Sequence, residues 1–170
     1  MSFTGAYEFT LAHEKGWYDG QHSRDPNPTL DGVTQRAYDA YRRRRNLPAR
    51  TVREMNPAER SDIYRDYWDA CDADLLPRRS AVAHFAFAFN AGPVTAVKVL
   101  QRALGIEADG RVGPITRAAI MGAVDDELLP ALLLEQLAYY HTVARPAHMR
   151  PNLMAWVGRV VGAFRYSPTT

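Results

Sequence analysis

Residues 81–89 are Ala81-Val82-Ala83-His84-Phe85-Ala86-Phe87-Ala88-Phe89, an apolar stretch interrupted only by one histidine. The phenylalanines alternate with alanines, and such alternation is typical of a strand. Helical patterns flank the stretch on both sides, however, and a helix that is apolar all round is buried in a core. We therefore predict a buried helix here, with His84 as a hydrogen-bonded core residue.

The segments on either side of this stretch also favour helices. The four residues Asn56-Pro57-Ala58-Glu59 are a strong start signal, because they combine an N-cap, a proline at the first helical position and a capping-box glutamate. Apolar residues at helical spacing predict further helices over residues 4–15, 33–46, 94–104, 115–121, 125–145 (with Pro130 at its start or at a kink) and about 157–164. The predicted fold class is all-α.

Composition excludes several kinds of protein. The 170 residues carry a formal net charge of +2, as expected of an ordinary globular domain. Cys71 is the single cysteine, so an internal disulfide is excluded and this thiol is expected to pack as a small hydrophobe. The first residues, Met1-Ser2-Phe3-Thr4-Gly5, predict no signal peptide, and no apolar run predicts stable membrane insertion.

A basic stripe lies in the first third of the chain. Its arginines are interleaved with Tyr38 and Tyr41, and they are Arg36, Arg42, Arg43, Arg44, Arg45, Arg50 and Arg53. A solvated helix face balanced by acids has this pattern, and so does a surface that binds nucleic acid or another polyanion. The charge pattern alone leaves these alternatives open.

Glu14 is the strongest candidate for chemistry. Tyr7, Leu11 and Glu14 follow the i, i+4, i+7 spacing of one helix face, and Trp17 and Tyr18 come directly afterwards. A carboxyl group partly removed from water resists ionising, as the general acid of a glycosidase must. The alternative is an ordinary exposed glutamate at a helix end.

Metal chemistry finds little support. His13-Glu14 begins the motif H-E-x-x-H of zinc peptidases, but its fifth residue is Trp17 in place of the second histidine. The remaining histidines show no ligand-like spacing. We predict no metal and no other cofactor.

Motifs spread along the chain resemble one family in their order. They are His13-Glu14-Lys15-Gly16-Trp17, Asp25-Pro26, Gly32-Val33-Thr34-Gln35, Tyr64-Arg65-Asp66-Tyr67-Trp68-Asp69, Asn90-Ala91-Gly92, Leu100-Gln101-Arg102-Ala103-Leu104-Gly105, Asp109-Gly110-Arg111-Val112-Gly113-Pro114-Ile115-Thr116 and Ala155-Trp156-Val157-Gly158-Arg159-Val160. This set resembles glycoside hydrolase family 108, which comprises phage endolysins and related bacterial secretion-activator proteins. The later motifs resemble the family's C-terminal module, a predicted peptidoglycan-binding domain.

The resemblance implies a lysozyme-like helical fold, a single compact domain with the C-terminal module packed on it. Residues 1–92 are then the muramidase region, and residues 93–170 are the module, which we expect to share the same core. The implied activity is that of an N-acetylmuramidase, which cuts the β-1,4 bond between N-acetylmuramic acid and N-acetylglucosamine. The family's catalytic glutamate corresponds to Glu14.

The implied partner is bacterial peptidoglycan, and we expect a monomer that binds no nucleic acid. Without a signal peptide, a phage enzyme accumulates in the host cytoplasm before lysis and reaches the cell wall through a holin or another export route.

The remaining site roles are assigned to a small set of residues. Asp25 is our first choice for the second catalytic group, ahead of Asp19 and Asp31. Thr34 either positions the attacking water or caps its helix. The candidates for substrate binding are Trp17, Tyr18 and Tyr38, as platforms for sugar stacking, and Asn90, which either binds an acetamido group or caps a helix.

Departures from the family pattern and the basic stripe keep two other functions open. Lys15 replaces a glycine after the glutamate, Asn27-Pro28 stands near an expected glycine pair, and Ala86 replaces a common aspartate. A non-catalytic wall-binding or regulatory protein on the same fold is therefore one alternative. A helical nucleic-acid binder that uses the basic stripe is the other.

Overall fold

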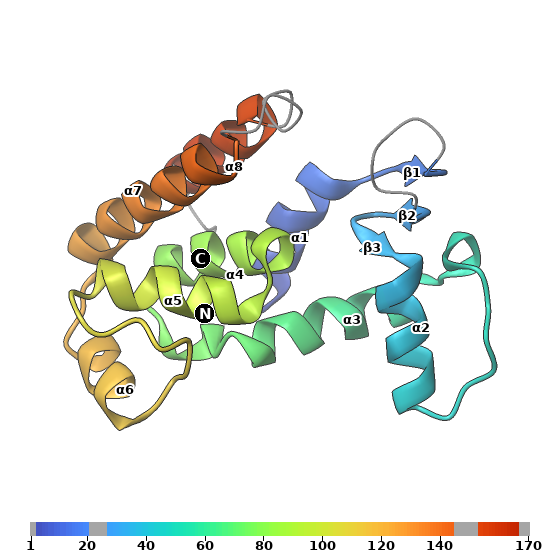
Figure 1. Ribbon diagram of the computed structural model, residues 1–170, viewed down its shortest axis with the longest axis horizontal. Coiled ribbons are helices and arrows are strands. Elements are labelled where there is room, and N and C mark those ends of the chain that lie inside the picture. The colour runs from blue at the N-terminus through green and yellow to red at the C-terminus, as the bar shows by residue number, and fades with distance from the viewer. Residues whose placement is uncertain (1–2, 21–26, 145–152, 167–170) are drawn as a thin grey trace. The chain divides into compact units, whose positions relative to one another are not determined.

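The computed structural model describes residues 3–20, 27–144 and 153–166, and Figure 1 shows its elements. Its α-helices are α1 (Phe3–Glu14), α2 (Gln35–Arg44), α3 (Pro57–Ala70), α4 (Arg78–Ala91), α5 (Pro93–Ala103), α6 (Pro114–Met121), α7 (Asp125–Val143) and α8 (Leu153–Arg165). The shorter elements are the 3-10 helices η1 (Val52–Glu54) and η2 (Ala73–Leu75) and the strands β1 (Trp17–Tyr18), β2 (Thr29–Leu30) and β3 (Val33–Thr34). Every predicted helix is present, and the all-α class is confirmed.

The chain divides into two compact units. The small unit is residues 7–66, and the large unit is residues 1–6 together with 67–170. The boundaries fall inside α1 and α3, so each of these helices contributes to both units. No helix in the described part of the chain combines the length and apolar character needed to cross a bilayer.

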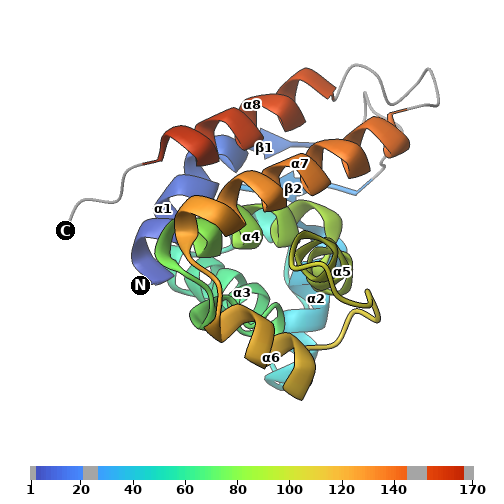
Figure 2. The same ribbon diagram turned by 90° about the vertical axis from the view of Figure 1, so that its left-hand side faces the viewer.

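Helix α4 is the centre of the large unit. Every residue from Ser80 to Ala88 is buried, and α4 packs against α5, α7 and α8. Figure 2 shows α7 and α8 running side by side beside it. The rings of Phe3 and Phe85 both pack edge-on against Trp68, with centroids 5.9 Å and 5.4 Å from the indole. The helical interpretation of the alternating stretch is therefore confirmed, because aromatic and alanine side chains both face neighbouring elements.

His84 is the core residue that the sequence predicts. It is fully buried, and its Nε2 lies 3.0 Å from the backbone oxygen of Cys71. A carbonyl oxygen only accepts, so Nε2 carries the proton and Nδ1 is a bare acceptor. Burial lowers the pKa of His84 to about 4, against the opposing effect of that hydrogen bond. Burial also raises the pKa of the Cys71 thiol to about 12, as suits a small packed hydrophobe.

Gln101 organises the loop between α5 and α6. This buried side chain shares the two hydrogens of its NH2 group among Asp109 Oδ1 (2.7 Å), the backbone oxygen of Arg111 (3.0 Å) and Thr116 Oγ1 (3.0 Å). Its oxygen accepts from the backbone N–H of Gly110 at 2.8 Å. One amide thus joins residues 109–111 of the loop to the start of α6.

The small unit contains a sheet that the sequence analysis did not predict. Strands β1, β2 and β3 pair antiparallel in that order, next to α2 (Figure 1). Asp31 and Gly32, which join β2 to β3, have φ angles of 49° and 76°. Positive φ at both positions is characteristic of a type I′ hairpin turn, for which Asp-Gly is a preferred pair. Each strand has only two residues, too few to give a period-two pattern.

A buried polar cluster joins α2 to α3 in the small unit. Glu59 accepts from the Tyr38 hydroxyl at 2.8 Å and pairs with Arg42 at 2.6 Å and with Arg50. Burial acts to raise the pKa of Glu59, but hydrogen bonds from Asn56 and Tyr38 and the two guanidinium charges outweigh it, so this pKa is lowered. Two arginines of the basic stripe therefore belong to this cluster, Arg42 buried and Arg50 half-buried.

Candidate active site

Glu14 ends α1 and is half-buried. On the same helix, Tyr7 packs edge-on against Tyr64, with ring centroids 5.0 Å apart. Burial raises the pKa of the Tyr64 hydroxyl, and the next largest cause is the negative charge of Glu14. The carboxyl group therefore lies close enough to this aromatic pair to act on it electrostatically, as the predicted helix face requires.

Asp31 fixes the chain that follows Glu14. Its Oδ1 accepts from the backbone N–H of Gly16 at 2.9 Å, and its own N–H donates to the Gly16 oxygen at 2.8 Å. Its other oxygen pairs with Arg60, and its backbone oxygen accepts from the Tyr64 hydroxyl at 2.7 Å. Asp31 was a candidate for the second catalytic group, but both of its carboxylate oxygens have protein partners, so we assign it a positioning role.

The sheet register sorts the candidate residues onto two faces. Tyr18 pairs with Thr29, and Thr29 pairs with Thr34. Directly paired residues share a face of the sheet, and successive residues alternate, so these three lie on one face and Trp17 lies on the other. Two of the candidates, Tyr18 and Thr34, are thus brought together, and Trp17 is separated from them.

Thr34 fills the capping role that was one of its two predicted alternatives. It is the N-cap of α2, and its Oγ1 accepts from the backbone N–H of Ala37 at 3.2 Å. This bond uses an oxygen lone pair and leaves the hydroxyl proton available. Thr29, whose hydroxyl donates to the Asn27 oxygen at 3.1 Å, is a site candidate that the sequence analysis missed. The sequence feature that could have indicated it is the pair of threonines, Thr29 and Thr34, on either side of the Asp31-Gly32 turn.

Trp17 remains accessible, at 40% exposed, and the guanidinium of Arg53 lies over its ring, 5.3 Å from the centroid. Tyr18 is half-buried, and its hydroxyl has no hydrogen-bond partner in the described part of the chain. Both side chains therefore have unused surface or bonding capacity in the small unit.

Two other candidate site residues lie away from the sheet, and a third is outside the described residues. Tyr38 is 0% exposed and its hydroxyl belongs to the Glu59 cluster, so the prediction that its ring stacks on a sugar is wrong. Asn90 is exposed in the last turn of α4, in the large unit, and donates to the Ala86 oxygen at 3.1 Å. Asp25 lies outside the described residues.

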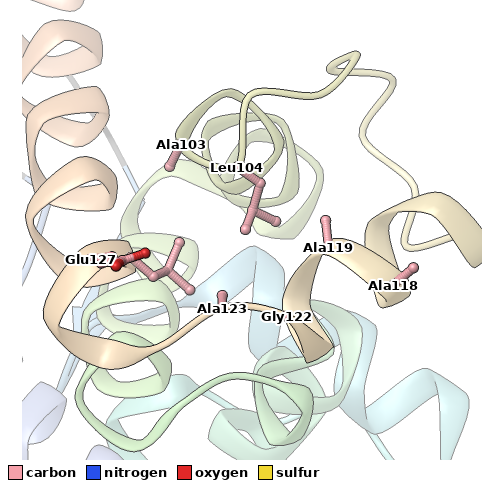
Figure 3. A pocket seen from close by; sticks show the side chains of 8 residues that line it. Ala103, Leu104, Ala118, Ala119, Gly122, Ala123 and Glu127 are labelled. Atoms are coloured by element: carbon pink, nitrogen blue, oxygen red, sulfur yellow. The ribbon is translucent and has the colours of Figure 1, made fainter.

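A groove of about 340 Å³ lies in the large unit, between the end of α5, α6 and the start of α7 (Figure 3). Most of the residues that line it have small side chains, and the full set is Ala103, Leu104, Ala118, Ala119, Gly122, Ala123, Glu127 and Leu128. In residues 3–20, 27–144 and 153–166, no three histidine, cysteine or acidic side chains gather as a metal site.

Comparison with protein families identifies the chain. Residues 7–92 match the family described as Glycosyl hydrolase 108. The chain belongs to glycosyl hydrolase family 108. Residues 95–161 of this family 108 protein match a second family, described as Predicted Peptidoglycan domain. It is accordingly a peptidoglycan hydrolase of the glycoside hydrolase class, with peptidoglycan as its partner.

Structural comparison agrees with this assignment. The solved structure of Brucella abortus SagA superposes with a TM-score of 0.74 at 28% sequence identity, covering 97% of each chain. The predicted lysozyme-like fold class is thereby confirmed. No match is found among curated proteins. The predicted division at residues 92 and 93 stays a prediction. The two compact units of this family 108 chain are divided at other positions, after residues 6 and 66.

Proposed function

We propose that this family 108 protein is an N-acetylmuramidase in which Glu14 is the general acid. The observation that carries the proposal is the position of Glu14: a half-buried carboxyl at the end of α1, followed by a segment that Asp31 holds at Gly16. A proton donor must be held in one place relative to the leaving oxygen, because misplacement by about 1 Å costs a large part of the rate.

The reaction follows from the chemistry of the glycosidic bond. Glu14 gives its proton to the bridging oxygen as the bond from that oxygen to C1 of N-acetylmuramic acid breaks, and positive charge develops on the ring. A water then adds to C1 and gives up its proton to a base. Asp25 remains our candidate for the second carboxyl, and the Thr29 and Thr34 hydroxyls are candidates for orienting this water.

Two of the candidate substrate contacts lie in the small unit, which also contains Glu14. Trp17 and Tyr18 offer aromatic surface on opposite faces of the sheet, and sugar C–H groups pack well on such rings. Asn90 stays our candidate for an acetamido contact. We also propose that the protein acts as a monomeric, bacteriolytic endolysin, held in the host cytoplasm until it reaches the wall.

Product analysis tests the proposal. Purified peptidoglycan is digested, and the soluble products are reduced with borohydride and analysed by mass spectrometry. Wild-type protein is expected to produce reduced muramic acid ends, and Glu14→Gln is expected to lower the rate about 10²- to 10⁴-fold because it removes the acid. Glu8→Gln, an exposed change on the same helix, is the matched control and is expected to retain full activity.

Three outcomes would count against the proposal. Reduced glucosamine ends would make the protein a glucosaminidase. Intact sacculi that bind the wild-type protein without being cut would favour the alternative of a non-catalytic wall-binding protein. DNA binding that falls steeply with salt would favour the nucleic-acid alternative.

A further inference from the structure

Most arginines of the basic stripe are engaged in ion pairs. Arg42 and Arg50 pair with Glu59, Arg44 pairs with Asp66, and Arg45 pairs with Asp62 and Asp66. Arg53, like Arg36 and Arg43 of the stripe, is exposed, and no carboxylate among the described residues lies within ion-pair distance of it. Among the described residues, its charge therefore has no carboxylate partner.

Arg53 is also held in a defined place. It lies in η1, which packs against β2, and its backbone N–H donates to the capping hydroxyl of Thr51 at 3.4 Å. Its guanidinium stands over Trp17, the residue three positions beyond Glu14. Stacking on an indole face orients a guanidinium without using its N–H groups, which remain free to bind a carboxylate in bidentate fashion.

We propose that Arg53 is a specificity-determining residue that binds a carboxylate of the peptide attached to the muramic acid. This inference rests on the proposed function, because it takes the Trp17 surface to be part of the glycan site. The lactyl group of muramic acid carries a peptide with free carboxylates, which neutral glycans lack. A guanidinium beside an exposed indole suits a ligand with a sugar face next to an anion.

Binding measurements test this without requiring turnover. In the Glu14→Gln background, Arg53→Gln and Arg53→Lys are titrated with soluble glycan fragments that bear peptides, and with the same fragments after an amidase has removed the peptides. Arg53→Gln is expected to weaken binding of the peptide-bearing fragments at least about tenfold, because the bidentate pair of charge-assisted hydrogen bonds is lost. Arg53→Lys keeps the charge but loses the paired N–H groups of the guanidinium, and its affinity is expected to lie between those of Arg53→Gln and the protein with arginine.

Controls separate this role from general electrostatics. Arg43→Gln removes another exposed arginine of the stripe and is expected to change binding less than twofold. Equal losses from Arg43→Gln and Arg53→Gln, or equal losses on fragments with and without peptide, would overturn the inference. So would an effect confined to a phosphate-bearing wall teichoic acid, tested as a third probe.

The two proposals fail in different experiments. Absence of reduced muramic acid ends from the wild-type digest refutes the muramidase. If Arg53→Gln weakens binding equally for fragments with and without the peptide, while the wild-type protein cleaves peptidoglycan, only the role of Arg53 is refuted.

Discussion

Asp31 joins three parts of the small unit through one residue. Its carboxylate binds the Gly16 N–H and Arg60, and its backbone oxygen accepts from Tyr64. Because it sits at positive φ, asparagine is the replacement that best tolerates its backbone conformation. An effect of Asp31→Asn would therefore come from the lost charge and not from a strained turn.

We expect Asp31→Asn to lower the turnover number at least about tenfold while wall binding is kept, because the residue that holds Gly16 loses its own ion pair with Arg60 and the segment after Glu14 is held less firmly. Breaking the partly buried pair with Arg60 is also expected to reduce the free energy of unfolding by about 2–4 kcal/mol. Hydrolysis of peptidoglycan and urea unfolding measure the two effects. Asp69→Asn, an exposed change on α3, is the control. Unchanged turnover in Asp31→Asn would show that this anchor is dispensable.

The environments of residues were predictable from sequence only where local pattern determines them. Glu14 ends a helix face with three recognisable members, and the structure keeps it half-buried there. The environment of Tyr38 depends on Glu59, which lies 21 positions further along the chain. An aromatic residue among arginines has the same local sequence whether its ring faces water or a buried carboxylate.

At the scale of elements, the helical spacing of apolar residues predicted most of the helices, and a capping signal predicted the start of α3. Asn56 and Glu59 form the expected reciprocal bonds, with Asn56 Oδ1 accepting from the Glu59 N–H at 2.9 Å and Glu59 Oε2 accepting from the Asn56 N–H at 3.1 Å. The three strands escaped prediction because cross-strand pairing, rather than residue periodicity, defines a two-residue strand. Pro130 lies inside α7, and the helix starts earlier, at Asp125.

The loop between α5 and α6 is an element whose order depends on one amide. Gln101→Met keeps the volume of the side chain but removes all of its hydrogen bonds to the loop. We expect a loss of about 2–4 kcal/mol in the free energy of unfolding, since the Gly110 N–H and the buried Thr116 hydroxyl lose a partner.

Thermal and urea unfolding check this expectation. Arg102→Met, at the next position, removes an exposed ion pair with Glu135 and is expected to cost at most about 1 kcal/mol. Equal losses in the two variants would mean that the loop does not depend on Gln101.

At the scale of the whole molecule, acid acts on the two units through different groups. In the large unit, the pKa of His84 is lowered to about 4 from an ordinary value of 6.5. The unfolded chain therefore gains a proton below pH 6.5 that the folded chain does not accept until about pH 4. Stability contributed by His84 is complete above pH 6.5 and is lost as the pH falls towards 4. In the small unit, the lowered pKa of Glu59 means that its contribution is lost only below its ordinary value of 4.5.

We expect the free energy of unfolding to fall by up to about 3 kcal/mol between pH 7 and pH 4 because of His84. Urea titrations at pH 7, 5.5 and 4.5 measure this slope. His84→Gln keeps a donor for the Cys71 oxygen but does not titrate, so its slope is expected to be smaller. Parallel slopes for the wild-type and variant proteins would assign the acid sensitivity to other groups.

The buried thiol of Cys71 makes this protein convenient for site-specific labelling. The sequence has no other cysteine, and the thiolate that reacts with maleimides is scarce at neutral pH when a thiol is buried and its pKa is about 12. A cysteine introduced at the exposed Lys15 would then be the one reactive position in an otherwise native background. A fluorophore attached there could follow wall fragments arriving beside Glu14 in real time, without first removing the native cysteine.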